Sequence, residues 1–214
     1  MRLIHIATAS AGLATALLLG SCATMSEEQC LAGNWSGQGY SDGRAGYGWS
    51  RLTEHAEACA KHGITPDNNA YYEGHARGVR AYCQPANGYR LGVNGSGISN
   101  GFCPADLESD FRYAYADGRT LYDANQRVND LQSRVYQSDE RVRDLERQMQ
   151  DQESQLGAEG LTDEQRRTIR DRIRTLRGDR DSERDAANGW RYDLDQARRE
   201  QSAIQNRMGA IYGY

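Results

Sequence analysis

The chain has 214 residues, a formal net charge of −4 and 26% charged residues. This acidic balance lacks the basic excess of nucleic-acid-binding proteins, so we expect no nucleic acid partner. Leu, Ile, Val and Phe supply only 24 of the 193 residues after residue 21, about 12%, which is too few for one large globular core. Disulfides, aromatic side chains and helix-on-helix packing must therefore stabilise the fold.

The N-terminal segment has the features of a secretory signal peptide. Arg2 precedes an apolar run from Ile4 to Leu19, which is shorter than the roughly 20 residues of a membrane span. Leu19-Gly20-Ser21-Cys22 is typical of a lipobox, the site at which a signal peptidase cleaves before a lipid-modified cysteine. We predict a signal peptide over residues 1–21 and a mature chain that begins at a lipidated Cys22.

The lipid anchor defines the expected localisation. Each acyl chain contributes about 0.8 kcal/mol per buried methylene, so a cysteine carrying two or three chains is held in a bilayer without a spanning helix. Ala23 follows Cys22, which resembles the outer-membrane address of lipoproteins in enteric bacteria. We predict an outer-membrane protein whose body lies in the periplasm and whose membrane partner is reached through the anchor.

Composition divides the mature chain into three parts. Residues 22–29 are predicted to form a lipidated tether, residues 30–118 a Gly-, Tyr- and Cys-rich helical module, and residues 119–214 an antiparallel coiled-coil hairpin with its turn near 157–161. The boundary at 118 is expected inside a helix. The predicted fold class is therefore all-α, a small disulfide-stapled helical module followed by a long hairpin.

Four cysteines remain in the module, and an even count in an oxidising compartment favours two disulfides. They are Cys30, Cys59, Cys83 and Cys103. Three connectivities are possible, and helix geometry narrows the choice. A helix over residues 51–61, ended by Gly63, places Cys59 near the turn, whereas a second helix with Pro66 at its first position carries Cys83 about 24 Å away. We favour Cys30 with Cys59 and Cys83 with Cys103.

Aromatic, acidic and glycine residues recur at fixed offsets in the module, as in Tyr40-Ser41-Asp42-Gly43 and Tyr115-Ala116-Asp117-Gly118. Glycines four residues apart give a helix a smooth patch for close packing. One interpretation is backbone packing around tyrosines. The other is a groove for a glycan or a peptide. Its lining residues would be Trp35, Tyr40, Trp49, Tyr71, Tyr72 and Tyr115.

Several motifs together carry a resemblance to a known family. They are Glu28-Gln29-Cys30-Leu31 with Trp35, Gly39-Tyr40-x-Asp42-Gly43, His55-x-x-x-Cys59, Gly63-Ile64-Thr65-Pro66-Asp67, Tyr71-x-x-Gly74-x-x-x-Gly78, Tyr82-Cys83 and Gly101-Phe102-Cys103-Pro104. The segment from Glu28 to about Tyr122 resembles a family of bacterial envelope lipoproteins known only as a domain of unknown function. The resemblance implies an envelope localisation and the pairing of all four cysteines. It implies no activity, cofactor or catalytic residue.

Two other patterns could carry chemistry. His55, Cys59 and His62 share one helix face at a spacing that suits a soft divalent metal, but a disulfide at Cys59 would remove the thiolate, so we predict no metal site. The glycines between 88 and 101 lack the lysine of a phosphate-binding loop, and we expect a flexible loop there. No nucleophile or acid/base pair stands out, so we predict neither catalytic residues nor cofactors, and no enzyme.

A heptad repeat begins at Leu121. Its apolar positions are Leu121, Val128, Val135, Val142, Met149 and Leu156, with Leu131 and Leu145 at the second position and interruptions at Ser138 and Gln152. Glycines at 157 and 160 break the pattern, and Thr162-x-x-Gln165 forms a capping box that opens a second helix. That helix carries Ile169, Ile173, Leu176, Ala187, Trp190, Leu194, Ala197, Ile204 and Met208.

Folding the chain about residue 159 aligns the apolar layers and brings Ser138 opposite Arg180. This register places Val128 against Trp190 and Leu121 against Ala197. It also brings Ile204 and Ile211 alongside Ala114 and Leu107, so the C-terminus returns to the module. It predicts an intramolecular hairpin about 65 to 70 Å long.

We expect a structural or adaptor role in which the hairpin contacts or spaces another envelope protein. The alternative is a glycan- or peptide-binding lipoprotein, with peptidoglycan as the partner.

Overall fold

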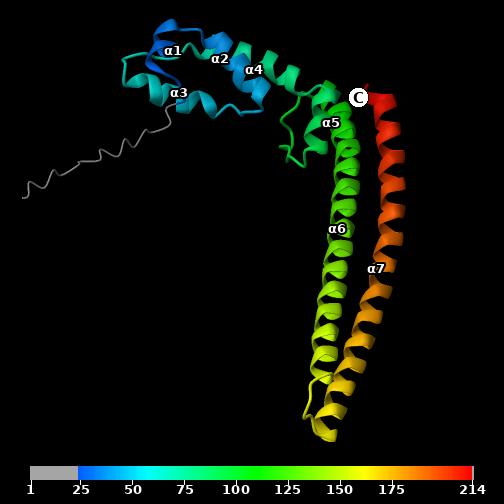
Figure 1. Ribbon diagram of the computed structural model, residues 1–214. Helices are drawn as coiled ribbons and strands as arrows, with labels where there is room; N and C mark the ends of the chain where they lie inside the picture. Colours follow the sequence, from blue (N-terminus) through cyan, green and yellow to red (C-terminus); the bar gives the residue numbers. More distant parts are fainter. Residues whose placement is uncertain (1–23, 214) are drawn as a thin grey trace, which may run out of the picture. The chain divides into compact units, whose positions relative to one another are not determined.

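The computed structural model describes residues 24–213, and these form helices without any strand, which confirms the all-α fold class (Figure 1). The signal segment, Cys22 and Ala23 lie outside the described residues. In chain order the helices are α1 (Glu27–Ala32), α2 (Trp35–Ala45), α3 (Arg51–Ala60), α4 (Asn68–Tyr82), α5 (Pro85–Val93), α6 (Ala105–Leu156) and α7 (Asp163–Tyr212). None of these seven is both long and apolar enough to cross a membrane.

The chain divides into two compact units within α4, between Gly78 and Val79. Unit 1 comprises α1 to α3 with most of α4, and unit 2 comprises the end of α4 with α5 to α7. The predicted module at residues 30–118 therefore contributes to both units. Composition placed the division at 118 because glycine becomes rare after that position, but α6 continues through it without a break.

The start of the fold differs from the expected tether. Ser26 and Gln29 form a capping box, since the Ser26 side chain accepts from the Gln29 N–H and the Gln29 side chain accepts from the Ser26 N–H. Met25 is only 4% exposed and packs against Trp35 and Cys30. Because residues 24–29 are folded onto unit 1, they do not form a free linker.

The structure pairs the cysteines as favoured from the sequence. Cys30 bonds Cys59 in unit 1, with the two Cα atoms 5.5 Å apart, and Cys83 bonds Cys103 in unit 2, with the Cα atoms 5.7 Å apart. The sequence separations are 29 and 20 residues. Loops of that size correspond to about 3 to 4 kcal/mol of lost unfolded-chain entropy for each bond. The disulfides thus offset the small number of aliphatic core residues.

Glycines allow two pairs of helices to cross with their backbones in contact. In unit 1, a Cβ added to Gly39 of α2 would overlap the Tyr71 carbonyl of α4 and lie 2.9 Å from the His75 nitrogen. In unit 2, a Cβ on Gly118 of α6 would overlap the Tyr89 carbonyl of α5 and lie 2.8 Å from the Val93 nitrogen. The tyrosine and glycine repeat is therefore a packing device in both units.

Two helix predictions needed correction. Residues 85–93, expected to be part of a flexible loop, form α5, because Pro85 starts the helix and the glycines at 88 and 92 face α6. The helix expected to begin at Pro66 begins at Asn68. Its first N–H groups are capped by Asp67, whose side chain accepts from the Ala70 N–H at 3.0 Å.

Helices α6 and α7 form the predicted antiparallel hairpin and run side by side along their length (Figure 1). They contain 52 and 50 residues, about 75 to 80 Å of helix. Thr162 and Gln165 form the capping box that starts α7, with hydrogen bonds of 2.8 and 3.2 Å. The arm is therefore slightly longer than the expected 65 to 70 Å.

The register of the hairpin differs from the prediction by about one heptad. Trp190, expected against Val128, packs against the cluster of Val128, Leu131, Leu194 and Ala197 and lies beneath the guanidinium of Arg134, six residues further along α6, at 4.9 Å. Leu121 shares its apolar cluster with Ile204 rather than with Ala197. Registers one heptad apart align the same apolar positions, so the repeat alone could not distinguish them.

The C-terminal end of α7 returns to α5 and α6, as expected. Tyr212 stacks on Tyr89 of α5 with ring centroids 4.3 Å apart, and Ile204 shares an apolar cluster with Ala114 of α6. Ile211 was expected beside Leu107 but is 59% exposed. The start of α6 and the end of α7 therefore pack together with α5, and the loop at 157–162 lies at the opposite, distal end of the hairpin.

Candidate functional site

A buried polar network in unit 1 is centred on the carboxylate of Asp42, which is 5% exposed. Asp42 Oδ2 accepts hydrogen bonds from Tyr71 Oη at 2.8 Å and from His55 Nε2 at 2.7 Å. Asp42 Oδ1 accepts from Gln38 Nε2 at 3.2 Å. Burial, together with the bond to Asp42, raises the pKa of the Tyr71 hydroxyl well above its usual range. One carboxylate therefore joins α2, α3 and α4.

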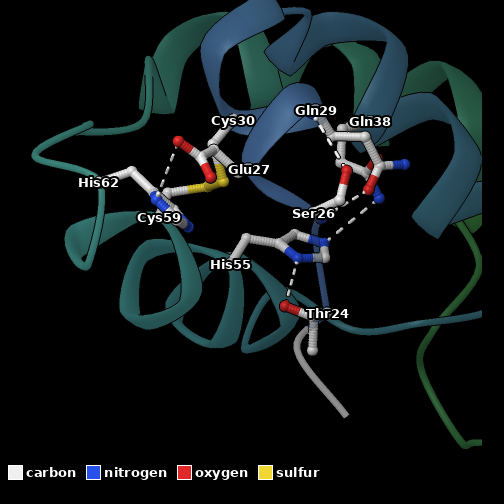
Figure 2. The surroundings of a disulfide bond; sticks show 9 residues. All are labelled: Thr24, Ser26, Glu27, Gln29, Cys30, Gln38, His55, Cys59 and His62. Carbon is white, nitrogen blue, oxygen red and sulfur yellow. Dashed lines mark hydrogen bonds and ion pairs between the residues drawn. A yellow bond between two sulfur atoms is a disulfide. The ribbon is translucent and has the colours of Figure 1, made fainter. Parts of the chain in front are cut away.

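The network extends through His55 to Thr24, at the start of the described chain. His55 has no solvent exposure, and its Nδ1 lies 2.7 Å from Thr24 Oγ1 (Figure 2). Thr24, His55 and Asp42 thus form a chain of hydroxyl, imidazole and carboxylate, the same order of groups as in the catalytic triad of serine hydrolases. Here, however, the imidazole is enclosed, with both ring nitrogens occupied by protein groups. In this conformation the hydrogen bond to His55 holds the chain in place at Thr24, and the buried imidazole is not accessible to a substrate.

Thr24 and Asp42 were not among the site residues predicted from the sequence. They lie 31 and 13 residues from His55, and no short motif links such distant positions. The capping box at Ser26 and Gln29 is a sequence signal that could have shown that the chain is folded before Cys30. It could not have identified the contact between Thr24 and His55.

Of the six residues of the predicted groove, two are buried and one belongs to a different unit from the other five. Trp35 and Tyr71 are 4% and 0% exposed and belong to the core of unit 1. Tyr115 lies in unit 2, where its hydroxyl donates to the Ser96 carbonyl at 2.9 Å. Helix packing turns Trp35 and Tyr71 inward, so these two side chains do not line an exposed surface.

Trp49 and Tyr72 remain as an exposed aromatic pair in unit 1. Their ring centroids lie 5.1 Å apart in an edge-to-face arrangement, and the side chains are 55% and 41% exposed. Trp49 also packs on His75, with ring centroids 4.4 Å apart, which fixes its orientation. Tyr47 lies nearby in sequence, is 46% exposed and carries the Arg51 guanidinium 4.5 Å above its ring. We call Trp49 and Tyr72 the aromatic pair.

The histidines of the suspected metal pattern have other contacts. Cys59 is bonded to Cys30, so its sulfur is not a thiolate, and His55 belongs to the Asp42 network. His62 Nδ1 lies 3.7 Å from a Glu27 carboxylate oxygen (Figure 2). Among residues 24–213 no group of three or more His, Cys, Asp or Glu side chains is placed to hold a metal ion.

Unit 2 repeats one feature of the Asp42 network. Asp117 precedes Gly118 as Asp42 precedes Gly43, and its carboxylate accepts from the Tyr212 hydroxyl at 2.8 Å. Burial and this hydrogen bond raise the pKa of Tyr212 to about 12. In each unit, the aspartate beside a glycine therefore fixes a tyrosine from another helix.

The hairpin contains one buried polar layer. Ser138 is fully buried in the seam, and its Oγ accepts from Arg141 at 3.1 Å. Arg141 also donates to Glu183 of α7 at 2.6 Å. The sequence predicted Arg180 opposite Ser138, but Arg180 pairs with its neighbour Asp181. The hydrogen bonds from Arg141 and Ser138 lower the pKa of Glu183.

This lowered pKa predicts an acid-sensitive hairpin. A carboxyl whose pKa is lower in the folded than in the unfolded chain stabilises the fold above the unfolded value of about 4.3. That contribution is lost as the pH falls through the folded value. We expect the urea midpoint of the hairpin to fall on acidification below that range, and Glu183→Gln to reduce this dependence. Equal acid dependence in parent and variant would contradict the assignment.

Part of the chain matches a known protein family. Residues 34–120 match a family described as protein of unknown function, DUF2799. No curated protein and no solved structure matches the chain. The DUF2799 match spans α2 to the first third of α6 and therefore includes both glycine crossings and the Asp42 network without Thr24. The matched segment does not include the rest of α6 or any of α7.

Proposed function

We propose that the protein is a lipid-anchored envelope protein with a structural or adaptor role, and that its hairpin contacts or spaces another periplasmic or outer-membrane component. The proposed anchor is Cys22, with residues 1–21 removed as a signal peptide and the body facing the periplasm. The observation that carries the proposal is the hairpin, an arm of about 75 to 80 Å whose apolar seam is closed within one chain.

The hairpin is suited to contact through its outer faces. Ion pairs join its two helices along the arm, between Arg127 and Glu200, Arg141 and Glu183, Arg184 and Glu146, Arg177 and Glu153, and Arg191 and Asp139. Such exposed pairs contribute little stability individually, but they hold the helices in register without a second chain.

Two exposed tyrosines mark candidate contact points on the arm. Tyr136 of α6 and Tyr192 of α7 are 63% and 65% exposed. Tyrosine is enriched where proteins meet, because it covers a large contact area and can still form a hydrogen bond. A partner surface that covers Tyr136 and Tyr192 would explain why an arm with mostly polar outer faces leaves these two aromatic rings in solvent.

Photo-crosslinking in living cells tests the adaptor role. Benzoylphenylalanine would replace Tyr136 or Tyr192 on the arm and, as a matched position near the base of α6, Tyr113, which is 73% exposed. We expect the arm positions to capture one defined envelope protein that Tyr113 captures poorly. Capture of nothing from the arm, with labelling of a ligand from a probe at Tyr72 in unit 1, would contradict it.

A second candidate function is binding of a glycan or peptide, such as a fragment of peptidoglycan, by the aromatic pair. An exposed Trp whose ring is fixed by neighbouring rings offers a flat surface for a sugar ring. Titration with muropeptides should then produce a saturable change in Trp49 fluorescence that is lost in Tyr72→Ala. No change in the parent protein would exclude this function for the fragments tested.

A further inference from the structure

The contact between Thr24 and His55 fixes how far the lipid anchor is from unit 1. Thr24 lies two residues after Cys22, and two residues span at most about 7 Å. Thr24 Oγ1 lies 2.7 Å from His55 Nδ1, and Met25 is buried in the core of unit 1. The point at which a lipid would be attached therefore lies within about two residue lengths of a folded surface.

We infer that Thr24 and Met25 act as a latch that seats unit 1 directly on the phospholipid headgroup layer. This inference rests on the proposed lipid anchor at Cys22. A free linker over residues 23–29 would reach about 25 Å and let the unit move away from the bilayer. With the latch closed, only Ala23 separates the lipidated residue from the fold.

The position of His55, which binds Thr24, is fixed by other residues of unit 1. The imidazole is fixed on its other side by Asp42, and Asp42 is in turn held by Tyr71 of α4. With the Nε2 proton donated to Asp42, Nδ1 accepts from the Thr24 hydroxyl, so both ring nitrogens are used by protein groups.

Exposed charged side chains neighbour Met25 and His55 in the sequence, which suits headgroups rather than hydrocarbon. Glu27, at the start of α1, has a side chain that is 66% exposed, and the nearby His62 side chain is 30% exposed. On α3, Glu54 is 49% exposed and pairs with Arg51. Ionised side chains are costly in the bilayer interior and are readily accommodated among hydrated headgroups. The proposed anchor at Cys22 brings this face to the bilayer, and its ionised side chains favour the headgroup layer over the hydrocarbon interior as its occupant.

Energy transfer from Trp35 provides a direct test. Trp35 lies in the same core cluster as Met25, and replacing Trp49 and Trp190 by phenylalanine leaves it as the single tryptophan. The full lipidated protein would be placed in vesicles of phosphatidylethanolamine and phosphatidylglycerol containing dansyl-phosphatidylethanolamine. A Gly-Ser spacer of about ten residues after Ala23 adds a mean span of roughly 17 Å, so we expect it to lower transfer by about twofold or more.

Two conservative variants test the latch itself. Thr24→Ser keeps the hydroxyl and should preserve both the transfer and the protection from hydrogen exchange of the Ser26 amide, which donates to Gln29 Oε1 at 2.8 Å. Thr24→Val removes the hydroxyl and should reduce both. Equal transfer in the parent and the spacer protein, or equal protection in the two variants, would overturn the inference. The mass of the N-terminal peptide separates this failure from that of the anchor, because an unmodified Cys22 would overturn the proposed function as well.

Discussion

Replacing Asp42 by alanine is expected to destabilise unit 1 by about 3 to 5 kcal/mol. The carboxylate accepts hydrogen bonds from Gln38, His55 and Tyr71, and the side chains of His55 and Tyr71 have no solvent exposure. The variant leaves these buried donors without their acceptor and opens a cavity between three helices. Urea unfolding followed by Trp35 fluorescence would measure the loss, because Trp35 lies in the core of unit 1.

Two further variants separate the role of the network from a general effect of losing an acid. Tyr71→Phe removes one donor and should cost about 1 kcal/mol. Glu54→Ala removes a carboxylate of the same unit that is 49% exposed and pairs with Arg51 three residues before it on α3, so the change should stay within about 0.5 kcal/mol. If Asp42→Ala were as mild as Glu54→Ala, Asp42 would not be the centre of a stabilising network in unit 1.

The same substitution, glycine to alanine, is expected to have opposite effects at two helical positions of unit 2. At Gly118 the new Cβ would overlap the Tyr89 carbonyl, and neither backbone can move without separating α5 from α6, so we expect a loss of about 1 to 3 kcal/mol. At Gly178 of α7 nothing lies within 4 Å of the new Cβ. Alanine there should stabilise the helix by up to about 1 kcal/mol, the difference in helix propensity.

Thermal unfolding followed by circular dichroism would report both changes, since both positions lie on the helices of the hairpin. The comparison controls for helix propensity, which favours alanine at either site. A gain in stability at Gly118 would show that α5 and α6 are not in backbone contact there.

Patterns local in sequence predicted much of the fold. The heptad positions from Leu121 to Leu156 and the capping box at Thr162 defined the hairpin, because side-chain periodicity and helix caps act over a few residues. The cysteine pairing followed from the distance along one helix. Each of these predictions depends on neighbours within one or two elements.

Other features depend on contacts that local patterns do not encode. Glycines at 88 and 92 resemble a loop in the sequence, and their role in a helix appears only when α6 lies against them. The register of the hairpin was ambiguous by one heptad, and the polar layer chosen to resolve it is satisfied by Arg141 on the same helix as Ser138. The burial of Trp35 and the contact between Thr24 and His55 are likewise tertiary.

Both the proposed function and the latch rest on the proposed anchor at Cys22, so its chemistry is the most direct test of the account. The protein would be purified from membranes of cells that express the full chain, and the mass of the intact protein and of its N-terminal peptide would be measured. The account predicts a chain that begins at Cys22 and carries a diacylglyceryl group on the cysteine sulfur. A chain that retains residues 1–21 with an unmodified Cys22 thiol would contradict it.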